Sequence, residues 1–228
     1  MKYVVITGGS SGIGAALVAV YHKNGYKVIS LDMVLPSYKV PGVIYEQVDI
    51  RDIDKLRNIA EQCNRIDLLI NNAAIQYVSP LKDYSDEKIK EMIDTNILGT
   101  INVTRAFLSR LKGGLIINIG SVHSSVPRTN KIPYDISKAA LVMFTKELAL
   151  ELEKEGTRAL CVEFGAVKTP MNDDFKDKKQ MEDAVKKQII DHLMTSEECA
   201  EVVYELSSDK FKYMNGEVIK YDCGRSVK

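Results

Sequence analysis

The sequence predicts an α/β fold, a doubly wound parallel sheet with helices on both faces. Short runs rich in β-branched residues alternate with helical patterns along the chain, which is typical of parallel sheets. Several of these runs are almost wholly apolar, as strands buried on both faces are. A glycine-rich turn follows the first run directly, and this order of strand, turn and helix is typical of nucleotide-binding sites.

Seven runs are predicted as strands. In chain order they are KYVVIT (2–7), YKVISL (26–31), GVIYEQV (42–48), DLLI (67–70), LIINIG (115–120), RALCVEF (158–164) and EVIKY (217–221). A helix is predicted from residue 12 to about residue 23, where Asn24 and Gly25 form a plausible C-terminal cap. A longer helix is predicted from residue 134 to about residue 154.

The length favours a single domain that spans residues 1–228, and the composition excludes several classes of partner. The 228 residues carry 31 Lys plus Arg and 31 Asp plus Glu, so no net field attracts nucleic acid or an anionic membrane. The first apolar run is too short for a signal peptide or a membrane span, and we expect a cytoplasmic protein. The four cysteines are scattered without metal-ligand spacing, so we expect reduced thiols and no metal.

The most polar stretch is 172–187. A solvated helix face is the simpler interpretation, and its place after the sixth strand also permits a substrate lid.

The glycine-rich turn TGGSSGIG (7–14) is suited to binding a pyrophosphate. Gly8, Gly12 and Gly14 allow a tight turn, a close approach of backbone N–H groups to an anion, and close packing of the following helix on the sheet. We expect Ser10, Ser11 and Ile13 of the same turn to contact the nucleotide as well.

Asp32 ends the second predicted strand, 24 residues after Gly8. At that spacing a carboxylate can accept hydrogen bonds from the adenosine ribose hydroxyls of NAD, and its charge would repel the 2′-phosphate of NADP. Neither Ser10 nor Ser11 supplies the positive charge that NADP requires. The sequence therefore favours NAD over NADP, although Asp32 as an ordinary turn residue is the alternative.

Tyr134 and Lys138 are four residues apart on a predicted helix, and therefore share one face. A Tyr hydroxyl has a pKa near 10, and a neighbouring ammonium favours its phenolate, so the pair is suited to acid/base chemistry. Ser121 follows an apolar strand, at the edge of the sheet where ligands of open α/β folds bind. Its hydroxyl could hold a substrate oxygen.

Taken together, these motifs resemble those of the short-chain dehydrogenase/reductase family over nearly the whole chain. The matching elements occur in the family's order and are TGGSSGIG (7–14), Asp49, NNAA (71–74), Asn96, Ser121, YDISK (134–138), Thr169 within VKTPM, and NGEVIKYDCG (215–224).

The resemblance implies a Rossmann fold with a seven-stranded sheet, and hydride transfer between NAD(H) and a carbonyl or secondary alcohol. It implies that Tyr134 is the acid/base, that Ser121 polarises the carbonyl, and that Lys138 holds the nicotinamide ribose and lowers the Tyr134 pKa. Asn96 would support a water in a proton relay. It also implies further contacts with the cofactor. Asp49 and Ile50 would flank the adenine, Asn72, Ala73 and Ala74 would line the cofactor trough, and Val167 and Thr169 would contact the carboxamide. Family members commonly form tetramers, so a homotetramer or homodimer is expected.

Three positions depart from the family pattern. Ala74 and Phe164 replace a Gly and a Pro, and Cys223 lies within an ending that is usually Asp-Gly-Gly. We expect the methyl of Ala74 to be tolerated and the loop after Phe164 to be less constrained.

Two other functions remain open at this point. A nucleotide-sensing regulatory protein could keep the fold without turnover, but it would not need Asn96, Ser121, Tyr134 and Lys138 together. A sugar-nucleotide epimerase or dehydratase uses a similar Tyr and Lys, but usually with TGxxGxxG spacing and a larger C-terminal region. His123 lies too close to Ser121 in sequence to act as its base, and we assign it to the pocket wall at most.

Overall fold

The computed structural model describes residues 1–171 and 178–228. Within these residues one sheet has the strand order β3-β2-β1-β4-β5-β6-β7, and every neighbouring pair of strands is parallel. The predicted doubly wound fold is confirmed. The strands are β1 (Tyr3–Thr7), β2 (Lys27–Asp32), β3 (Ile44–Gln47), β4 (Leu68–Asn71), β5 (Leu115–Ser121), β6 (Arg158–Phe164) and β7 (Val218–Tyr221).

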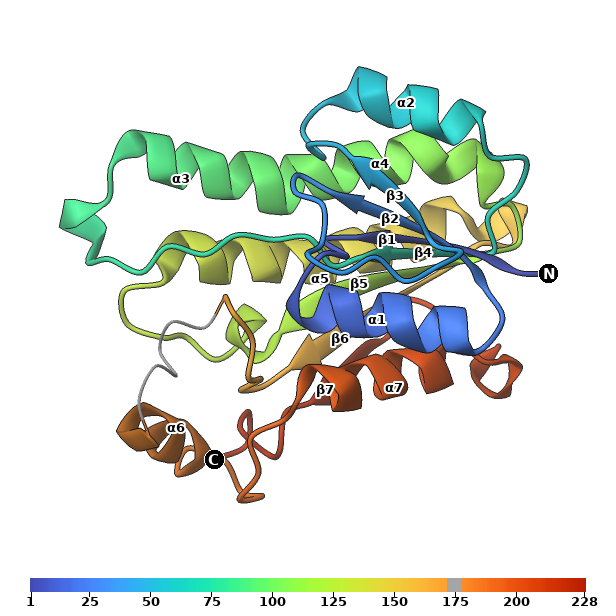
Figure 1. Cartoon of the computed structure of the whole chain (residues 1–228). Coiled ribbons are helices and arrows are strands. Elements are labelled where there is room, and N and C mark those ends of the chain that lie inside the picture. The colour runs from blue at the N-terminus through green and yellow to red at the C-terminus, as the bar shows by residue number, and fades with distance from the viewer. Residues whose placement is uncertain (172–177) are drawn as a thin grey trace.

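The helices cover both faces of the sheet (Figure 1). They are α1 (Gly12–Lys23), α2 (Ile53–Glu61), α3 (Asp86–Ile93), α4 (Thr100–Phe107), α5 (Ile132–Glu151), α6 (Lys178–Val185) and α7 (Ser196–Leu206). The first of these has the predicted bounds. The stretch 172–187 is described only in part, because residues 172–177 lie outside the described ranges, and its interpretation as a lid remains a prediction.

Two apolar cores lie on opposite faces of the sheet. One packs α1 and α7 against the sheet through residues such as Leu17 and Val203, and the other packs α2, α4 and α5 through Leu56, Phe107 and Leu148. All residues of β4 and β5 are buried, as predicted from their apolar sequences.

The chain reverses its direction of winding between β1 and β4. After β1 it adds β2 and β3 on one side, and β4 then pairs with the other side of β1. In open α/β sheets, ligands bind outside the carboxyl ends of the strands at this kind of switch point.

Candidate active site

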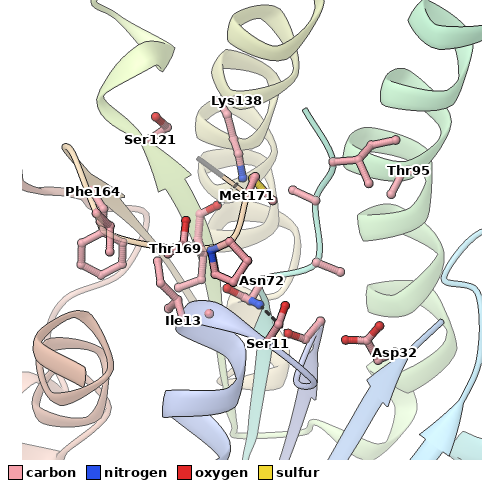
Figure 2. Close-up of a pocket in the computed structure, with 18 of the residues that line it drawn as sticks. Ser11, Ile13, Asp32, Asn72, Thr95, Ser121, Lys138, Phe164, Thr169 and Met171 are labelled. Atoms are coloured by element: carbon pink, nitrogen blue, oxygen red, sulfur yellow. Dashed lines mark hydrogen bonds between the residues drawn. The ribbon is translucent and has the colours of Figure 1, made fainter. Parts of the chain in front are cut away.

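A cavity of about 260 Å³ lies at the carboxyl ends of the central strands (Figure 2). Most of the predicted cofactor residues line it, and they are Gly8, Ser11, Gly12, Ile13, Asp32, Ile50, Asn72, Ala73, Ala74, Tyr134, Lys138, Val167 and Thr169. Ser10, Gly14 and Asp49 are not among the lining residues, so the direct contact of these three residues with the cofactor stays a prediction.

The glycines of the turn are required by its backbone and by close packing. Gly8 and Gly12 have φ values of +67° and +52°, a region that side chains with a Cβ rarely adopt. A Cβ on Gly8 would lie 2.9 Å from the Cα of Ala73. A Cβ on Gly14 would lie 1.9 Å from the carbonyl oxygen of Gly8. Gly14 therefore sets the packing of α1 on the turn, which explains why it does not line the cavity.

The N-terminus of α1 faces the cavity without a protein cap. The side chains of Asp52, Ser85 and Thr195 cap the N-termini of α2, α3 and α7. Ser11, which precedes α1, makes no such hydrogen bond, and the first turn of α1 carries no acidic residue. Unpaired N–H groups and the helix dipole favour an anion at this end. The turn therefore fits the pyrophosphate of a dinucleotide.

Asp32 lies at the end of β2, at the side of the cavity away from Ser121 (Figure 2). Its carboxylate accepts hydrogen bonds from the backbone N–H groups of Ser10 and Val34, at 3.0 and 3.2 Å. These contacts fix the carboxylate beside the glycine-rich turn. Ser10 acts here through its backbone, and its hydroxyl donates to the carbonyl oxygen of Val34.

Thr7 joins the ends of β1 and β4, a role that the sequence reasoning missed. Its hydroxyl accepts from the backbone N–H groups of Asn72 and Ala73, at 2.9 and 3.0 Å. The Asn72 amide donates in return to the carbonyl oxygens of Thr7 and Gly8. The cavity wall formed by residues 72–74 is thus held to the glycine-rich turn.

Asp49 has a different environment from the predicted one. Its carboxylate accepts three side-chain hydrogen bonds from the Arg51 guanidinium and one from the Arg51 backbone. The guanidinium lowers the pKa of the Asp49 carboxyl. Val48 and Ile50, on either side of it in sequence, line the cavity instead. The wall expected to meet adenine is therefore apolar at this position.

Ser121, Tyr134 and Lys138 come together at the other end of the cavity. Ser121 is the last residue of β5, whereas Tyr134 and Lys138 lie one turn apart on α5. The Lys138 ammonium nitrogen lies 5.7 Å from the centre of the Tyr134 ring and donates to the carbonyl oxygen of Ile119 at 2.8 Å. Figure 2 shows the Lys138 side chain reaching from its helix into the cavity.

The protonation preferences of this group are set mainly by burial. Burial raises the pKa of the Tyr134 hydroxyl to about 12, and a hydrogen bond with Ser121 opposes the rise. Burial lowers the pKa of Lys138 to about 8. Desolvation disfavours the charged form of each group. In this structure burial outweighs the hydrogen bond with Ser121 at Tyr134, and the expected lowering of the Tyr134 pKa by Lys138 stays a prediction.

Asn96 lies in a π-helical turn, Asp94–Gly99, that joins α3 to α4. Its amide is fully buried, accepts from the backbone N–H of Ile75 at 2.8 Å, and donates to the Ile75 carbonyl oxygen and to Ser137. π-Helical turns occur frequently at functional sites. In this structure the side chain connects the segment after β4, which lines the cavity, to α5.

A second cavity, of about 290 Å³, meets the first one at Ser121, Tyr134 and Gly165, which line both. His123 lines only the second cavity, which agrees with its predicted place in a pocket wall. Its Nδ1 shares a hydrogen bond with the carbonyl oxygen of Val126, and burial lowers its pKa. Ser121 and Tyr134 thus lie where the two cavities meet.

Two departures from the family pattern have structural consequences. Phe164 continues β6 to its end and packs edge-on against Tyr221 on β7, with ring centres 6.4 Å apart. It also lines the first cavity beside Gly165. Cys223 has a φ of +54°, in the region that favours glycine. Its backbone carbonyl accepts from the N–H groups of Ile189 and Ile190, which fixes this strained conformation.

Further lining residues of the first cavity were not predicted. Most are apolar or lack a motif, so only their place in the fold identifies them, and they are Leu31, Met33, Val48, Ile75, Thr95, Ile119, Gly120, Phe164, Gly165, Pro170 and Met171.

Neither a cluster of metal-ligating side chains nor a membrane-spanning helix occurs in the described part of the chain. No group of three or more His, Cys, Asp or Glu side chains there is arranged to hold a metal ion. None of the helices in the same ranges is long and apolar enough to cross a membrane.

The fold and the paired cavities define a Rossmann-type nucleotide-binding protein, and comparisons with known proteins identify its family. The model of the short chain dehydrogenase family matches residues 2–180. The chain is 30% identical to 3-oxoacyl-(acyl-carrier-protein) reductase FabG of Thermotoga maritima, over 98% of this chain and 97% of that protein. The chain therefore belongs to the short-chain dehydrogenase/reductase family of oxidoreductases.

Solved structures of the same family agree with this assignment. A short-chain dehydrogenase from Leptospira borgpetersenii with bound NAD+ is 26% identical, with a TM-score of 0.90 over 99% of this chain and 92% of that one. Another, from Burkholderia cenocepacia in complex with NADP, is also 26% identical, with a TM-score of 0.87 over 98% and 97% of the two chains. Similar structures thus bind either nicotinamide cofactor.

Proposed function

We propose that this protein is an NAD-dependent dehydrogenase or reductase that interconverts a carbonyl group and a secondary alcohol. The observation that carries the proposal is the place of Ser121 and Tyr134, two residues that line both cavities. One cavity contains the glycine-rich turn and fits a dinucleotide, while the other is open to a second molecule. A hydride donor and its acceptor would then meet at these two hydroxyls.

A nicotinamide bound in the first cavity would supply or accept the hydride. In the direction of reduction, the Tyr134 hydroxyl donates its proton to the carbonyl oxygen as the carbonyl carbon gains the hydride. Ser121 donates a hydrogen bond to the same oxygen and stabilises its developing charge. In oxidation the Tyr134 phenolate takes the proton from the alcohol. Tyr134 is protonated at neutral pH, as a general acid must be before it donates, and burial favours this neutral form further.

Lys138 and Asn96 have supporting roles in this proposal. The Lys138 ammonium lies within the first cavity, where it can hold the nicotinamide ribose and stabilise the Tyr134 phenolate when that forms. The Asn96 amide fixes the backbone of Ile75, and we assign to Asn96 the support of a proton relay.

The cofactor preference is proposed from Asp32. Its carboxylate lines the first cavity and is fixed by the backbone of Ser10 and Val34, in reach of a ribose bound beside the turn. A fixed negative charge would repel the 2′-phosphate of NADP. We therefore assign NAD as the preferred cofactor.

A regulatory protein that binds the nucleotide without turnover is the alternative, and one experiment separates the two. NADH oxidation is followed by absorbance with a panel of ketones, aldehydes and oxo acids, for the wild type and for Tyr134→Phe. We expect wild-type turnover and a loss of about 10² to 10⁴ in kcat for the variant, with NADH affinity retained. Tight NADH binding with no turnover on any compound would favour the regulatory protein.

A further inference from the structure

A buried carboxyl group close to Ser121 has no part in the proposed mechanism. Glu163 lies one residue before the end of β6 and is only 1% exposed. Burying a carboxyl group costs free energy unless hydrogen bonds or charges compensate it, and burial raises the pKa of this one. Its Oε2 atom has no hydrogen-bond partner among the described residues. The contact that its other oxygen makes therefore decides whether this side chain has a role.

The sheet places Glu163 beside the end of β5. In the parallel ladder Glu163 pairs with Gly120, and Phe164 pairs with Ser121. Gly120 leaves the space that the glutamate occupies, because a Cβ on Gly120 would lie 3.0 Å from the Cγ of Glu163. Successive side chains of a strand point to opposite faces of the sheet, so Glu163 does not share a face with the Ser121 side chain. Any effect of Glu163 on Ser121 must therefore pass through another residue.

That residue is Ser124, whose hydroxyl donates a hydrogen bond to the Oε1 atom of Glu163. Ser124 is the last residue of a short 3₁₀ helix, Val122–Ser124, that follows β5 directly. The contact attaches this turn to β6, although the two residues are 39 positions apart in the chain. A carboxyl oxygen can accept whether the group is ionised or carries its proton on the other oxygen. The attachment therefore does not depend on the protonation of Glu163.

The same turn fixes the hydroxyl of Ser121. Ser121 is the N-terminal cap of the turn, and its Oγ accepts from the backbone N–H of His123 at 3.2 Å. A hydroxyl that accepts one hydrogen bond keeps its own hydrogen, which Ser121 can donate to an oxygen of Tyr134 or of a substrate. The direction of this hydroxyl therefore depends on where the turn places the His123 N–H.

A neighbouring contact of the same loop differs in its exposure. Ser125 follows the turn, and its Oγ accepts from the ammonium of Lys220 on β7 at 3.2 Å. Both residues are exposed, so water can replace either partner when this contact breaks. At Glu163 burial prevents such a replacement. The loss of the contact between Glu163 and Ser124 should therefore cost more than the loss of the contact between Ser125 and Lys220.

We propose that Glu163 is a positioning residue for Ser121. Through Ser124 it holds the turn Val122–Ser124 against β6, and the turn directs the Ser121 hydroxyl toward the reacting oxygen. Glu163 is not among the residues that line either cavity, so it acts without touching cofactor or substrate. This inference rests on the proposed function for the role of Ser121, and it adds a residue on which that role depends.

Hydrogen exchange tests the attachment of the turn without a substrate. We expect Ser124→Ala and Glu163→Met, which break the contact from either side, to speed amide exchange in the segment 122–126 about fivefold to tenfold. Glu163→Gln keeps an oxygen that can accept from Ser124 and should exchange like the wild type. Ser125→Ala, the matched control, removes only the exposed contact with Lys220 and should not speed exchange at His123. Unchanged exchange in both contact-breaking variants would overturn the inference.

Kinetics test the effect on Ser121, with a compound that the wild type turns over. Ser124→Ala and Glu163→Met should lower kcat about tenfold and leave KM for NADH unchanged. This is less than the loss of about 10² to 10³ that follows removal of an oxyanion donor, because the hydroxyl is displaced and not removed. Glu163→Gln should restore kcat. In a Ser121→Ala protein the further change Ser124→Ala should have no effect on kcat, because the hydroxyl on which it acts is absent.

Failure of the inference and failure of the proposed function give different results. A wild-type kcat in both contact-breaking variants would overturn the positioning role of Glu163 and leave the proposed function in place. An equal fall in kcat on Ser124→Ala with and without the Ser121 hydroxyl would assign the effect to general damage and overturn the inference in the same way. Absence of turnover by the wild type with every compound would overturn the proposed function and the positioning role together.

Discussion

The ammonium of Lys138 lies 5.7 Å from the centre of the Tyr134 ring, yet its hydrogen bond goes to the carbonyl oxygen of Ile119. Burial shifts the pKa values of the two groups in opposite directions, that of Tyr134 up to about 12 and that of Lys138 down to about 8. Both side chains favour their neutral forms more strongly than they would in water. This relationship has consequences for the pH dependence of activity and of stability.

The first consequence concerns the direction of the reaction. Because Tyr134 is largely protonated below pH 10, the fraction of phenolate available to take a proton from an alcohol increases with pH. We expect kcat/KM for alcohol oxidation to rise between pH 7 and pH 10, by up to about tenfold per unit, whereas kcat/KM for carbonyl reduction does not rise. Initial rates in both directions over this range are the measurement. A flat oxidation profile would contradict the role of Tyr134 as the base.

The second consequence concerns stability. The pKa of Lys138 falls from 10.5 in the unfolded chain to about 8 in the fold, so between these values the unfolded chain binds more protons. The desolvation cost is fully present below pH 8 and disappears as the pH rises. Relative to Lys138→Met, the wild type should therefore gain free energy of unfolding between pH 7.5 and pH 10. Urea denaturation of both proteins at these two pH values measures the gain, and a constant difference would argue against a depressed pKa.

Asp32 provides a test of cofactor selectivity. Asp32→Ser removes the carboxylate charge from the first cavity, so we expect the ratio of kcat/KM for NADH to that for NADPH to fall by about tenfold or more. Asp32→Asn is the matched control, because it removes the charge while keeping one of the two side-chain oxygens that accept from the backbone of Ser10 and Val34. A similar fall in both variants assigns the selectivity to charge. A wild type that prefers NADPH would overturn the NAD assignment.

Substitution of Asn96 tests whether its amide positions the backbone of Ile75 for catalysis. Asn96→Ala removes the amide contacts to Ile75 and Ser137 and leaves buried backbone groups without partners, which costs about 1 to 3 kcal/mol. We expect a loss of stability and a fall in kcat with little change in KM for NADH. Ser137→Ala removes the contact with Asn96 at 3.0 Å and the hydrogen bond from Ser137 to the Tyr134 carbonyl oxygen, and it should keep the Ile75 backbone in place. If the two variants have equal kcat, the contact with Ile75 does not support catalysis.

Cys223 provides a test of backbone strain. With φ at +54°, Cys223→Gly should relieve the left-handed strain and raise the free energy of unfolding by about 1 kcal/mol. Cys223→Ala also removes the thiol but keeps a Cβ, so it should not be stabilising. Chemical denaturation of the three proteins makes the comparison. Equal stabilisation by both substitutions would assign the effect to the thiol.

Local patterns predicted most of the architecture. Strands β4 and β5 were predicted because burial on both faces leaves a continuous apolar run in the sequence. The bounds of α1 were predicted because the residues next to a helix end indicate where it stops. The glycines of the turn were identified for the same reason. The ion pair between Asp49 and Arg51 was not anticipated from the sequence, and the contact of Asp49 with the cofactor stays a prediction.

The sequence by itself determined the order of the strands along the chain, the glycine-rich turn, and the candidate residues for the proposed chemistry, since each of these is encoded by adjacent or regularly spaced residues. Tertiary structure alone decided the pKa shifts of Tyr134 and Lys138, because desolvation depends on what packs around a group. It also decided that Glu163 and Ser124 are in contact. These residues are 39 positions apart in the chain, and only the folded sheet with the turn after β5 brings them together close to Ser121.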